Sequence, residues 1–425
     1  MEQQNNIFDI ELLSLCRRLE SKLVNKSPMS LGSCIYRVPS TLRKHNEHLF
    51  EPNFISIGPY HRINVEKFQF TERIKLWYLN CIIARAPIDT SGKTRLQSFV
   101  ESIRPHVKRC RECYSEEVQI QTDDDEFIEM MIIDGCFLIE LFRRFAKIVQ
   151  PSEDDPLFKL PWLPKILMTE LLLLENQLPW FVLHRLFDLT KVDHGAETRS
   201  LVELVQHFFF WNALRAQSIG VNSSMEYKHL LDVQGNIILS GSDDAGGYFL
   251  RIPCVTDLLK AGIDFTVGEK TKLVKIIFEN GILTIPPLVI LENAESLFRN
   301  LIAYEQCDRS LRDRITGYAA FLDNLIKSSE DLEYLKKKGI VYFYLSAEDI
   351  SNFFNRLYKD ADLVNYTYRK LSEDVNAYCE SLWPRWRAML LRDYLNNPWS
   401  TMAFIAATVI LVLTFLQTLY AILYH

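Results

Sequence analysis

Glycine is scarce in this 425-residue chain, which has 15 Gly and 16 Pro beside 26 Phe, 18 Tyr and 7 Trp. Globular proteins usually contain about 7% Gly, so a protein built on glycine loops is disfavoured. No GxGxxG or GxSxG motif occurs, which removes the commonest signals of dinucleotide binding and of α/β-hydrolases. Residues 88–94 read Ile-Asp-Thr-Ser-Gly-Lys-Thr, but Pro87 stands where a Walker A loop needs its first glycine. We interpret this segment as a helix start.

A strong excess of charge of one sign is also missing. The chain has 48 basic and 54 acidic residues, a formal net charge of -6. No long basic stripe accompanies the aromatic residues, so nucleic acid is not an expected partner. The 48% hydrophobic and 24% charged fractions are those of a folded globular protein, which excludes disordered and collagenous classes.

The nine cysteines are odd in number and scattered, which is typical of reduced thiols in a cytosolic protein. Cys110 and Cys113, with His106 four residues before the first, offer three metal ligands in one stretch. A structural zinc site needs a fourth ligand, and a redox pair is typical of a βαβ unit rather than a charged helical pattern. We therefore expect no metal and no cofactor, with a metal or redox role for this stretch as the alternative.

The first 33 residues lack the uninterrupted apolar run of a signal peptide. Leucines and Ile7 recur at helical spacing over residues 7–23, which predicts an amphipathic helix. We expect it to pack on the body, with membrane contact as the alternative.

The segment 398–424 has 27 residues and no formal charge. As a helix, residues 402–424 would span about 34 Å, enough for a hydrocarbon core of about 30 Å. Three arginines lie shortly before this segment and only His425 follows it, so the positive-inside rule places the body in the cytosol. We predict a tail-anchored, single-pass protein of the secretory route, with the plasma membrane as its expected location; a buried core helix is the alternative. The residues that mark the anchor are Trp399, Met402, Tyr420 and Tyr424.

Three Asn-x-Ser/Thr sequons make this orientation testable, because a lumenal or external body would be glycosylated. They begin at Asn25, Asn222 and Asn365.

Periodicity predicts a mainly α fold, α+β with a minor β element, in one large helical body over residues 34–397 followed by one transmembrane helix over 398–424. A helix is clearest at 126–149, and others are expected at 73–84, 93–114, 198–213, 292–307, 314–327, 347–358 and 363–396, the last kinked at Pro384. β-like runs occur at 248–252, 272–278 and 282–291, the last broken by Pro286 and Pro287.

Several polar residues lie on otherwise apolar faces. A buried carboxylate or amide costs several kcal/mol unless it is paired, so each must be bonded or functional. We interpret them as a structural hydrogen-bond network that caps broken helices, because no nucleophile, metal cluster or glycine loop accompanies them. The alternative is a membrane-bound enzyme that uses Asp134 and Glu175 or Glu305 for acid–base work. The full set of candidates is Asp134, Glu175, Asn176, Gln177, Asn300, Glu305 and Gln306.

The same segments carry a family resemblance. Ordered motifs from about residue 34 to 424 resemble the plant family called domain of unknown function 247. The chain departs from the family pattern after Gly-Pro-Tyr-His, where it has Arg-Ile-Asn at 62–64, and in the charged residue before the Leu-Glu-Asn-Gln run, here displaced to Glu170. The motifs are Ile-Tyr-Arg-Val-Pro at 35–39, Ile-Ser-Ile-Gly-Pro-Tyr-His at 55–61, Met-Met-Ile-Ile-Asp-Gly-Cys-Phe at 130–137, Leu-Leu-Glu-Asn-Gln-Leu-Pro at 173–179, Ile-Pro-Pro-Leu at 285–288, Arg-Asn-Leu-Ile-Ala-Tyr-Glu-Gln at 299–306 and Asn-Pro-Trp-Ser at 397–400.

The resemblance implies a plant-specific protein that usually ends in one membrane span, without an established enzymatic activity or catalytic residues. Some members of the family look connected with reproduction, including pollen–pistil recognition and control of floral sex. Together with the anchor, this leads us to expect a non-enzymatic protein that binds an unknown protein partner at a membrane, in recognition, signalling or reproductive development.

Overall fold

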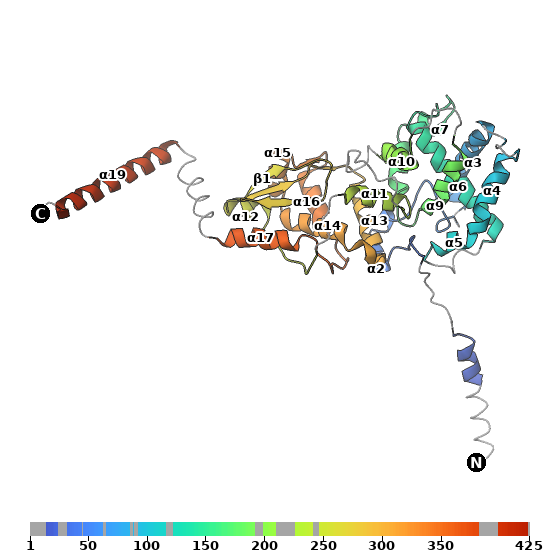
Figure 1. The fold of residues 1–425 in the computed structure, drawn as a ribbon, viewed down its shortest axis with the longest axis horizontal. Coiled ribbons are helices and arrows are strands. Elements are labelled where there is room, and N and C mark those ends of the chain that lie inside the picture. Colours follow the sequence, from blue (N-terminus) through green and yellow to red (C-terminus); the bar gives the residue numbers. More distant parts are fainter. Residues whose placement is uncertain are drawn as a thin grey trace, which may run out of the picture.

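The computed structural model describes residues 14–23, 32–44, 46–62, 65–85, 88, 92–115, 122–191, 199–209, 226–240, 246–381 and 398–423. Helices and two small sheets form an elongated body, and helix α19 (Pro398–Leu423) stands apart from it (Figure 1). The predicted mainly helical class with a minor β element is confirmed.

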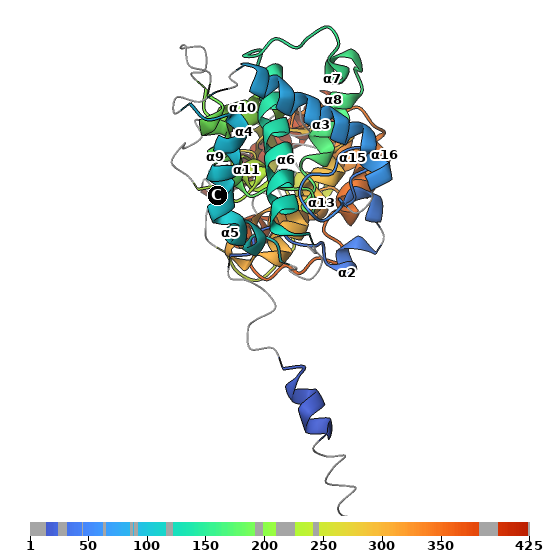
Figure 2. The same ribbon diagram turned by 90° about the vertical axis from the view of Figure 1, so that its right-hand side faces the viewer.

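Helix α6 (Asp124–Phe145) is the buried axis of the N-terminal half (Figure 2). The Asp123 carboxylate caps it by accepting from the Glu126 N–H at 2.8 Å, and its first turn is acidic while its last turn holds two arginines, as the helix dipole favours. Apolar residues on all its faces make it a core helix. Around or beside it lie α2 (Ser40–Arg43), α3 (Val65–Arg85), α4 (Arg95–Ile103), α5 (Val107–Glu112), α7 (Pro156–Lys159), α8 (Leu163–Glu170), α9 (Trp180–Leu189) and α10 (Leu201–Phe209), with 3-10 turns at Glu47–Leu49 and Arg104–His106.

The C-terminal half is built on α13 (Ala294–Cys307) and α14 (Arg314–Leu325), whose side chains are mostly buried. One hydrophobic cluster runs through both halves, from Cys34 to Val375, so the body has a continuous core. The other elements here are α11 (Leu230–Ile238), α12 (Val255–Lys260), α15 (Ser329–Lys337), α16 (Ala347–Arg356), α17 (Arg369–Glu380) and a 3-10 turn at Arg309–Leu311.

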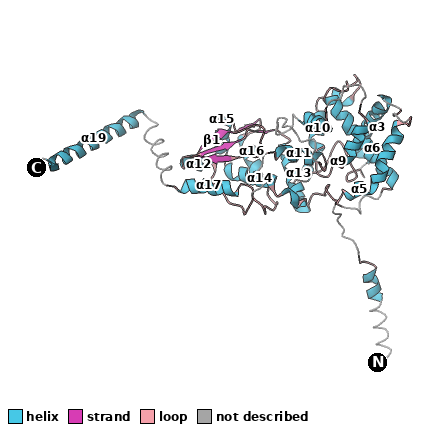
Figure 3. Cartoon of the chain, in the orientation of Figure 1, coloured by secondary structure: helices cyan, strands magenta, loops and turns pink. Residues whose placement is uncertain are grey.

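Two small sheets lie at the end of the body nearest α19 (Figure 3). In the first, β3 (Ile282–Ile285) pairs in parallel with β1 (Asp264–Val267) and antiparallel with β2 (Ile277–Glu279). Asn280 and Gly281 connect β2 to β3 with φ values of 52° and 77°, the backbone that a two-residue hairpin turn requires. In the second sheet, β4 (Leu288–Ile290) pairs in parallel with β5 (Val341–Phe343).

The strand predictions were partly wrong. Residues 248–252 form no strand, because their neighbourhood bonds to the C-terminal region instead: the Gly247 carbonyl accepts from the Tyr366 N–H at 2.7 Å, and the Arg251 carbonyl from Asn376 Nδ2 at 2.9 Å. The run at 272–278 is strand only from Ile277 onward. The run at 282–291 is indeed broken at the two prolines, and its halves β3 and β4 lie in different sheets.

The predicted terminal helices have mixed outcomes. At the N-terminus, residues 14–20 are helical, but Leu15, Leu19 and Leu23 are 46–72% exposed, so the expected packing on the body is wrong for this described part. Of the predicted helix at 363–396, α17 covers Arg369–Glu380, while Pro384 lies outside the described residues.

Helix α19 matches the expected span. Within it, Ile405–Leu423 is a candidate membrane-crossing stretch of 19 residues with mean hydropathy 2.1, and none of it is buried in the body. The hydroxyls of Thr414 and Thr418 donate to carbonyls one turn earlier at 2.8 Å, so these polar groups are satisfied within the helix. Among the predicted anchor residues, Met402 and Tyr420 are exposed, Trp399 lies in the first turn, and Tyr424 lies outside the described residues.

Candidate functional site

The candidate site is the buried turn between α8 and α9, residues 171–179. Its backbone is not helical, although leucines surround it, so its polar groups need partners other than a helix ladder. Three consecutive side chains of this turn, those of Glu175, Asn176 and Gln177, are at most 1% exposed. Glu175 and Asn176 bond to residues between 37 and 57, and Gln177 bonds within the turn and accepts from the Leu231 N–H at 3.2 Å.

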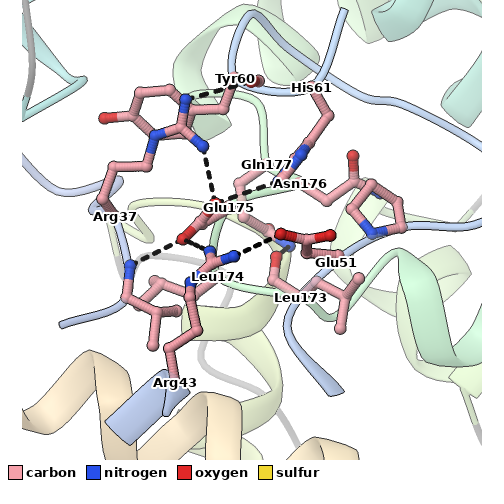
Figure 4. A network of polar contacts seen from close by, with 12 residues as sticks. Arg37, Arg43, Glu51, Tyr60, His61, Leu173, Leu174, Glu175, Asn176 and Gln177 are labelled. Carbon is pink, nitrogen blue, oxygen red and sulfur yellow. Dashed lines mark hydrogen bonds and ion pairs between the residues drawn. The ribbon is translucent and has the colours of Figure 1, made fainter. Parts of the chain in front are cut away.

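Glu175 is surrounded by donors from residues 34–61, which we call the N-terminal segment (Figure 4). Its Oε1 accepts from the Val38 N–H at 2.8 Å and from Arg43, and its Oε2 accepts from Arg37 Nη1 at 2.9 Å. His61 Nε2 lies 3.1 Å from Oε2 without the alignment of a hydrogen bond. We call these five residues the Glu175 network. Both carboxylate oxygens are engaged, and two arginines share one buried negative charge.

Asn176 and Gln177 satisfy backbone groups on both sides of the turn. Asn176 Oδ1 accepts from the Ile57 N–H at 2.6 Å, and its Nδ2 donates to the Ile55 carbonyl at 3.1 Å. Gln177 Nε2 donates to the carbonyls of Leu171 and Leu173 at 2.9 and 2.8 Å. The two amides therefore fix the shape of the turn and bind the segment 55–58 to it.

Asp134 holds the same segment from the other side. From the middle of α6, its Oδ2 accepts from the Gly58 N–H at 2.9 Å, and its Oδ1 lies 2.7 Å from Lys75 Nζ of α3. Lys75 also donates to the Ser56 carbonyl and to Glu72 Oε1. Both side chains of the Asp134–Lys75 pair are fully buried, so each compensates the charge of the other.

Gly58 cannot be replaced by a larger residue without strain. Its φ is +73°, and a Cβ atom would lie 2.6 Å from the Gln177 carbonyl oxygen and 3.0 Å from the Tyr114 hydroxyl. The close approach of the segment 55–61 to the buried turn thus depends on a residue without a side chain.

Asn300 extends the network into the C-terminal half. From α13, its Oδ1 accepts from the Leu174 N–H at 2.9 Å, next to Glu175, and its Nδ2 donates to the Leu49 carbonyl at 2.9 Å. One side chain therefore connects the buried turn, the N-terminal segment and α13. Together with the contacts above, the structure brings Asp134, Glu175, Asn176, Gln177 and Asn300 into one connected region.

Glu305 and Gln306 lie elsewhere. Glu305 accepts from the N–H groups of Ile315 and Thr316 at 2.7 and 2.8 Å, so it caps the start of α14. Gln306 exchanges two hydrogen bonds of 2.9 Å with the backbone of Asp362. Both residues line a cleft of about 600 Å³ at the body surface.

The two glutamates differ in their electrostatic surroundings. Burial raises the pKa of Glu175, but the contacts with His61, the Val38 N–H and Arg43 outweigh it and lower the pKa to about 2. Burial raises the pKa of Glu305 to about 7, although its carboxylate accepts three hydrogen bonds from Ile315 and Thr316 of α14.

Sequence reasoning missed most of the partners. Lys75 was detectable in principle, because Thr71, Tyr78 and Leu79 place it on the buried stripe of α3. Arg43 carried no local signal, since its partner is 132 positions away. A second cluster around α6 was missed as well: Tyr78, Glu140, Arg144 and Asp155 are buried, and the exposed Arg85 binds Glu140.

The described residues contain no group of three or more His, Cys, Asp or Glu side chains that could hold a metal ion. Cys110 and Cys113 are buried on and just after α5, and His106 precedes that helix. The stretch is thus placed on helix and 3-10 turn, as its charged pattern suggested, and not at the end of a strand.

These features define a class of protein: a large helical body, held together by a buried polar network, with a C-terminal candidate membrane helix. The sequence profile of the plant family of unknown function known as domain of unknown function 247 matches residues 35–413. The chain belongs to this family.

Two uncharacterised relatives in Arabidopsis thaliana support the assignment. One UPF0481 protein is 26% identical over 440 residues, covering 95% of this chain and 89% of the relative. A second UPF0481 protein is 23% identical over 506 residues, covering 96% and 93% respectively. No solved structure matches the chain.

Proposed function

We propose that the chain is a tail-anchored protein whose body faces the cytosol and acts by binding a protein partner rather than by catalysis. The anchor rests on α19, which is long and apolar enough to cross a bilayer and whose candidate span is not buried in the body. A fully exposed apolar helix of this length is costly in water and is stabilised by lipid.

The cytosolic orientation is supported by charge and by thiol state. Arginines 385, 387 and 392 lie shortly before the span, on the side of the body, as the positive-inside rule favours for a cytosolic body. The nine cysteines are odd in number and scattered along the sequence, which is typical of reduced thiols.

A glycosylation assay tests this orientation. An Asn-x-Thr acceptor tag placed after His425 is expected to be glycosylated in microsomes, while the same tag placed before Met1 stays unmodified. The native sequon at Asn365 is a poor reporter, because its side chain is partly buried and donates to the Arg312 carbonyl. Modification of the N-terminal tag alone would contradict a cytosolic body.

The interaction role rests on one observation about the carboxylates. Both oxygens of Glu175 and both of Asp134 accept from side chains or N–H groups that hold the fold together. Groups bonded in this way join segments and are poorly placed to exchange protons with a substrate.

Proximity labelling from the full chain in floral tissue tests the interaction. We expect a set of neighbours that survives exchange of α19 for an unrelated membrane span and is absent when α19 alone carries the labelling enzyme. If α19 alone collected the same neighbours, the body would not be the binding element. We further propose, from the family resemblance, that this binding serves recognition or signalling, such as pollen–pistil recognition or floral sex control. Normal pollination and floral sex in plants lacking the protein would contradict that part.

The alternative, a membrane-bound enzyme, has one specific observation in its favour. Glu305 lines a cleft and has a pKa of about 7, the range suited to a general acid or base. The substitution Glu305→Gln separates the two readings. Loss of biological function with unchanged thermal stability and unchanged neighbours would favour the enzyme, whereas retained function would favour the interaction role.

A further inference from the structure

Two cysteines from distant parts of the sequence lie opposite each other beside a surface cleft. Cys34 is in the N-terminal segment and Cys113 follows α5; they are 7% and 8% exposed. Both line a cleft of about 470 Å³. Sequence spacing pairs Cys113 with Cys110, but the fold pairs it with Cys34.

Backbone hydrogen bonds connect the two chain segments that carry these cysteines. The Cys113 carbonyl accepts from the N–H groups of Cys34 and Ile35 at 2.8 and 2.9 Å, and the Ile35 carbonyl accepts from the Ser115 N–H at 3.0 Å. Ile35 and Tyr114 form an isolated parallel bridge, and each cysteine immediately precedes one of these two residues. The backbone hydrogen bond from Cys34 to Cys113 brings the two residues about as close as neighbouring strands, ~5 Å. A disulfide needs a Cα separation of about 4.4–6.8 Å.

We propose that Cys34 and Cys113 form a reversible oxidation site, at which a hydroperoxide converts the two thiols into a disulfide. This inference is independent of the proposed partner binding. It assigns a role to the cysteine stretch at 110–113 that neither the fold nor the anchor explains.

The surroundings favour Cys113 as the attacking sulfur. The neighbouring Cys34 side chain lowers the pKa of Cys113, and the guanidinium of Arg109 acts in the same direction, while the Cys113 thiol donates to the Arg109 carbonyl at 3.3 Å. The contact with Cys113 and burial raise the pKa of Cys34. Arg109 and Lys228 line the cleft together with the carboxylates of Glu112, Glu226 and Asp308, so Arg109 acts on Cys113 as a near neighbour and not through a net positive cleft. Burial raises the pKa of Cys110 to about 12, which leaves that sulfur a poor nucleophile.

The chemistry balances in two steps. The Cys113 thiolate attacks the hydroperoxide and breaks its O–O bond; the sulfur becomes a sulfenic acid, and the leaving oxygen takes up a proton and departs as an alcohol or water. The Cys34 sulfur then attacks the sulfenic sulfur, forms the S–S bond and releases water. Two thiols and one hydroperoxide thus give one disulfide, one alcohol and one water, and a dithiol reverses the change.

Oxidation would fasten the N-terminal segment to the end of α5. Cys34 stands three residues before Arg37, which binds Glu175. The disulfide would therefore secure, by a covalent bond, the segment that the Glu175 network holds by charge.

The test uses the full chain in detergent, treated with hydrogen peroxide, blocked with a thiol reagent and analysed by mass spectrometry without reduction. We expect a linked peptide pair containing Cys34 and Cys113, two hydrogens lighter than the separate peptides, that dithiothreitol releases. The matched control Cys110→Ser should form the same link. A link between Cys110 and Cys113, or no link when the exposed Cys16 is already oxidised, would overturn the proposal.

The order of attack has its own readout. In Cys34→Ala, which keeps a small apolar side chain at the site, the Cys113 sulfenic acid cannot be resolved and is expected to accumulate as a dimedone adduct. In Cys113→Ser, no dimedone adduct is expected at Cys34. The reverse pattern would overturn the assignment of Cys113 as the nucleophile.

Discussion

The substitution Glu175→Gln tests whether the Glu175 network stabilises the fold by charge. The pKa of Glu175 falls from 4.5 to about 2 on folding. Each unit of pKa shift corresponds to about 1.4 kcal/mol, so the ionised carboxylate contributes about 3 kcal/mol to the free energy of unfolding at neutral pH. Glutamine keeps the shape but not the charge, and it leaves Arg37 and Arg43 without their buried counter-ion.

The pH dependence gives the prediction its sign. Because the pKa is depressed in the folded state, the stabilisation is complete above about pH 4.5 and is lost as the pH falls toward 2. We expect Glu175→Gln to lower the free energy of unfolding by about 3 kcal/mol near pH 7 and by only about 1 kcal/mol near pH 3. Urea denaturation of the detergent-solubilised full chain, followed by tryptophan fluorescence at both pH values, measures these differences.

Glu51→Gln is the matched control. Glu51 binds the same Arg43, with Oε1 at 2.6 Å from Nη1, but its side chain is 41% exposed. Exposed ion pairs contribute at most about 1 kcal/mol, so this variant should remain close to wild type. The charge argument would be refuted by a Glu175→Gln deficit no larger than that of Glu51→Gln near pH 7. A deficit equally large near pH 3 would also refute it, since it would show a packing defect instead.

Three further predictions concern single positions. The folded-state pKa of Glu305 is raised from 4.5 to about 7, so the free energy of unfolding of the wild type should decline by about 3 kcal/mol as the pH rises through that window. Glu305→Gln should abolish this decline in urea denaturation at a series of pH values. The same pH dependence in the variant would contradict the prediction. Gly58→Ala should lower the free energy of unfolding by about 2 kcal/mol or more in thermal denaturation, because backbone strain and a clash with the Gln177 carbonyl add. The control Gly92→Ala, at φ +81° with open space around it, should lower it by about 1 kcal/mol. Equal losses would show that the close approach of Gly58 to the buried turn is unimportant. Lys75→Met should lower the free energy of unfolding by about 3–5 kcal/mol, because it leaves the Asp134 charge without its buried cation. Adding Asp134→Asn should recover part of that loss. If the effects of the two substitutions simply add in a double-mutant cycle, the two side chains are not a coupled pair.

Local patterns made part of this fold predictable. The apolar periodicity predicted a helix at 126–149, which α6 confirms over Asp124–Phe145, and the uncharged run 398–424 predicted α19. Strands β1 and β5 were missed, because four and three residues are too short to show an alternation of their own. Their pairing is decided by the elements that pack on them.

The candidate site was predictable only on one side of each contact. A carboxylate inside a leucine run, as at Glu175, predicts a hydrogen-bond or charge partner elsewhere in the chain, because burying an unpaired charge costs too much free energy. Nothing near Arg37 or Arg43 indicates that it is that partner, since arginine is common on surfaces and the separation exceeds 130 residues. Long-range pairing depends on the whole topology, which periodicity does not encode.

The connections of Asn300 and of the buried turn also set an order of assembly during synthesis. The Ile57 N–H can bond to Asn176 only after 119 further residues have been synthesised, and the Leu49 carbonyl can bond to Asn300 only after 251. Such distant contacts make folding slow, because the entropy of loop closure is spent before the contacts form. A nascent chain that has been synthesised past Asn176 but not yet to Asn300 can therefore bind its N-terminal segment to the buried turn, but not yet to α13.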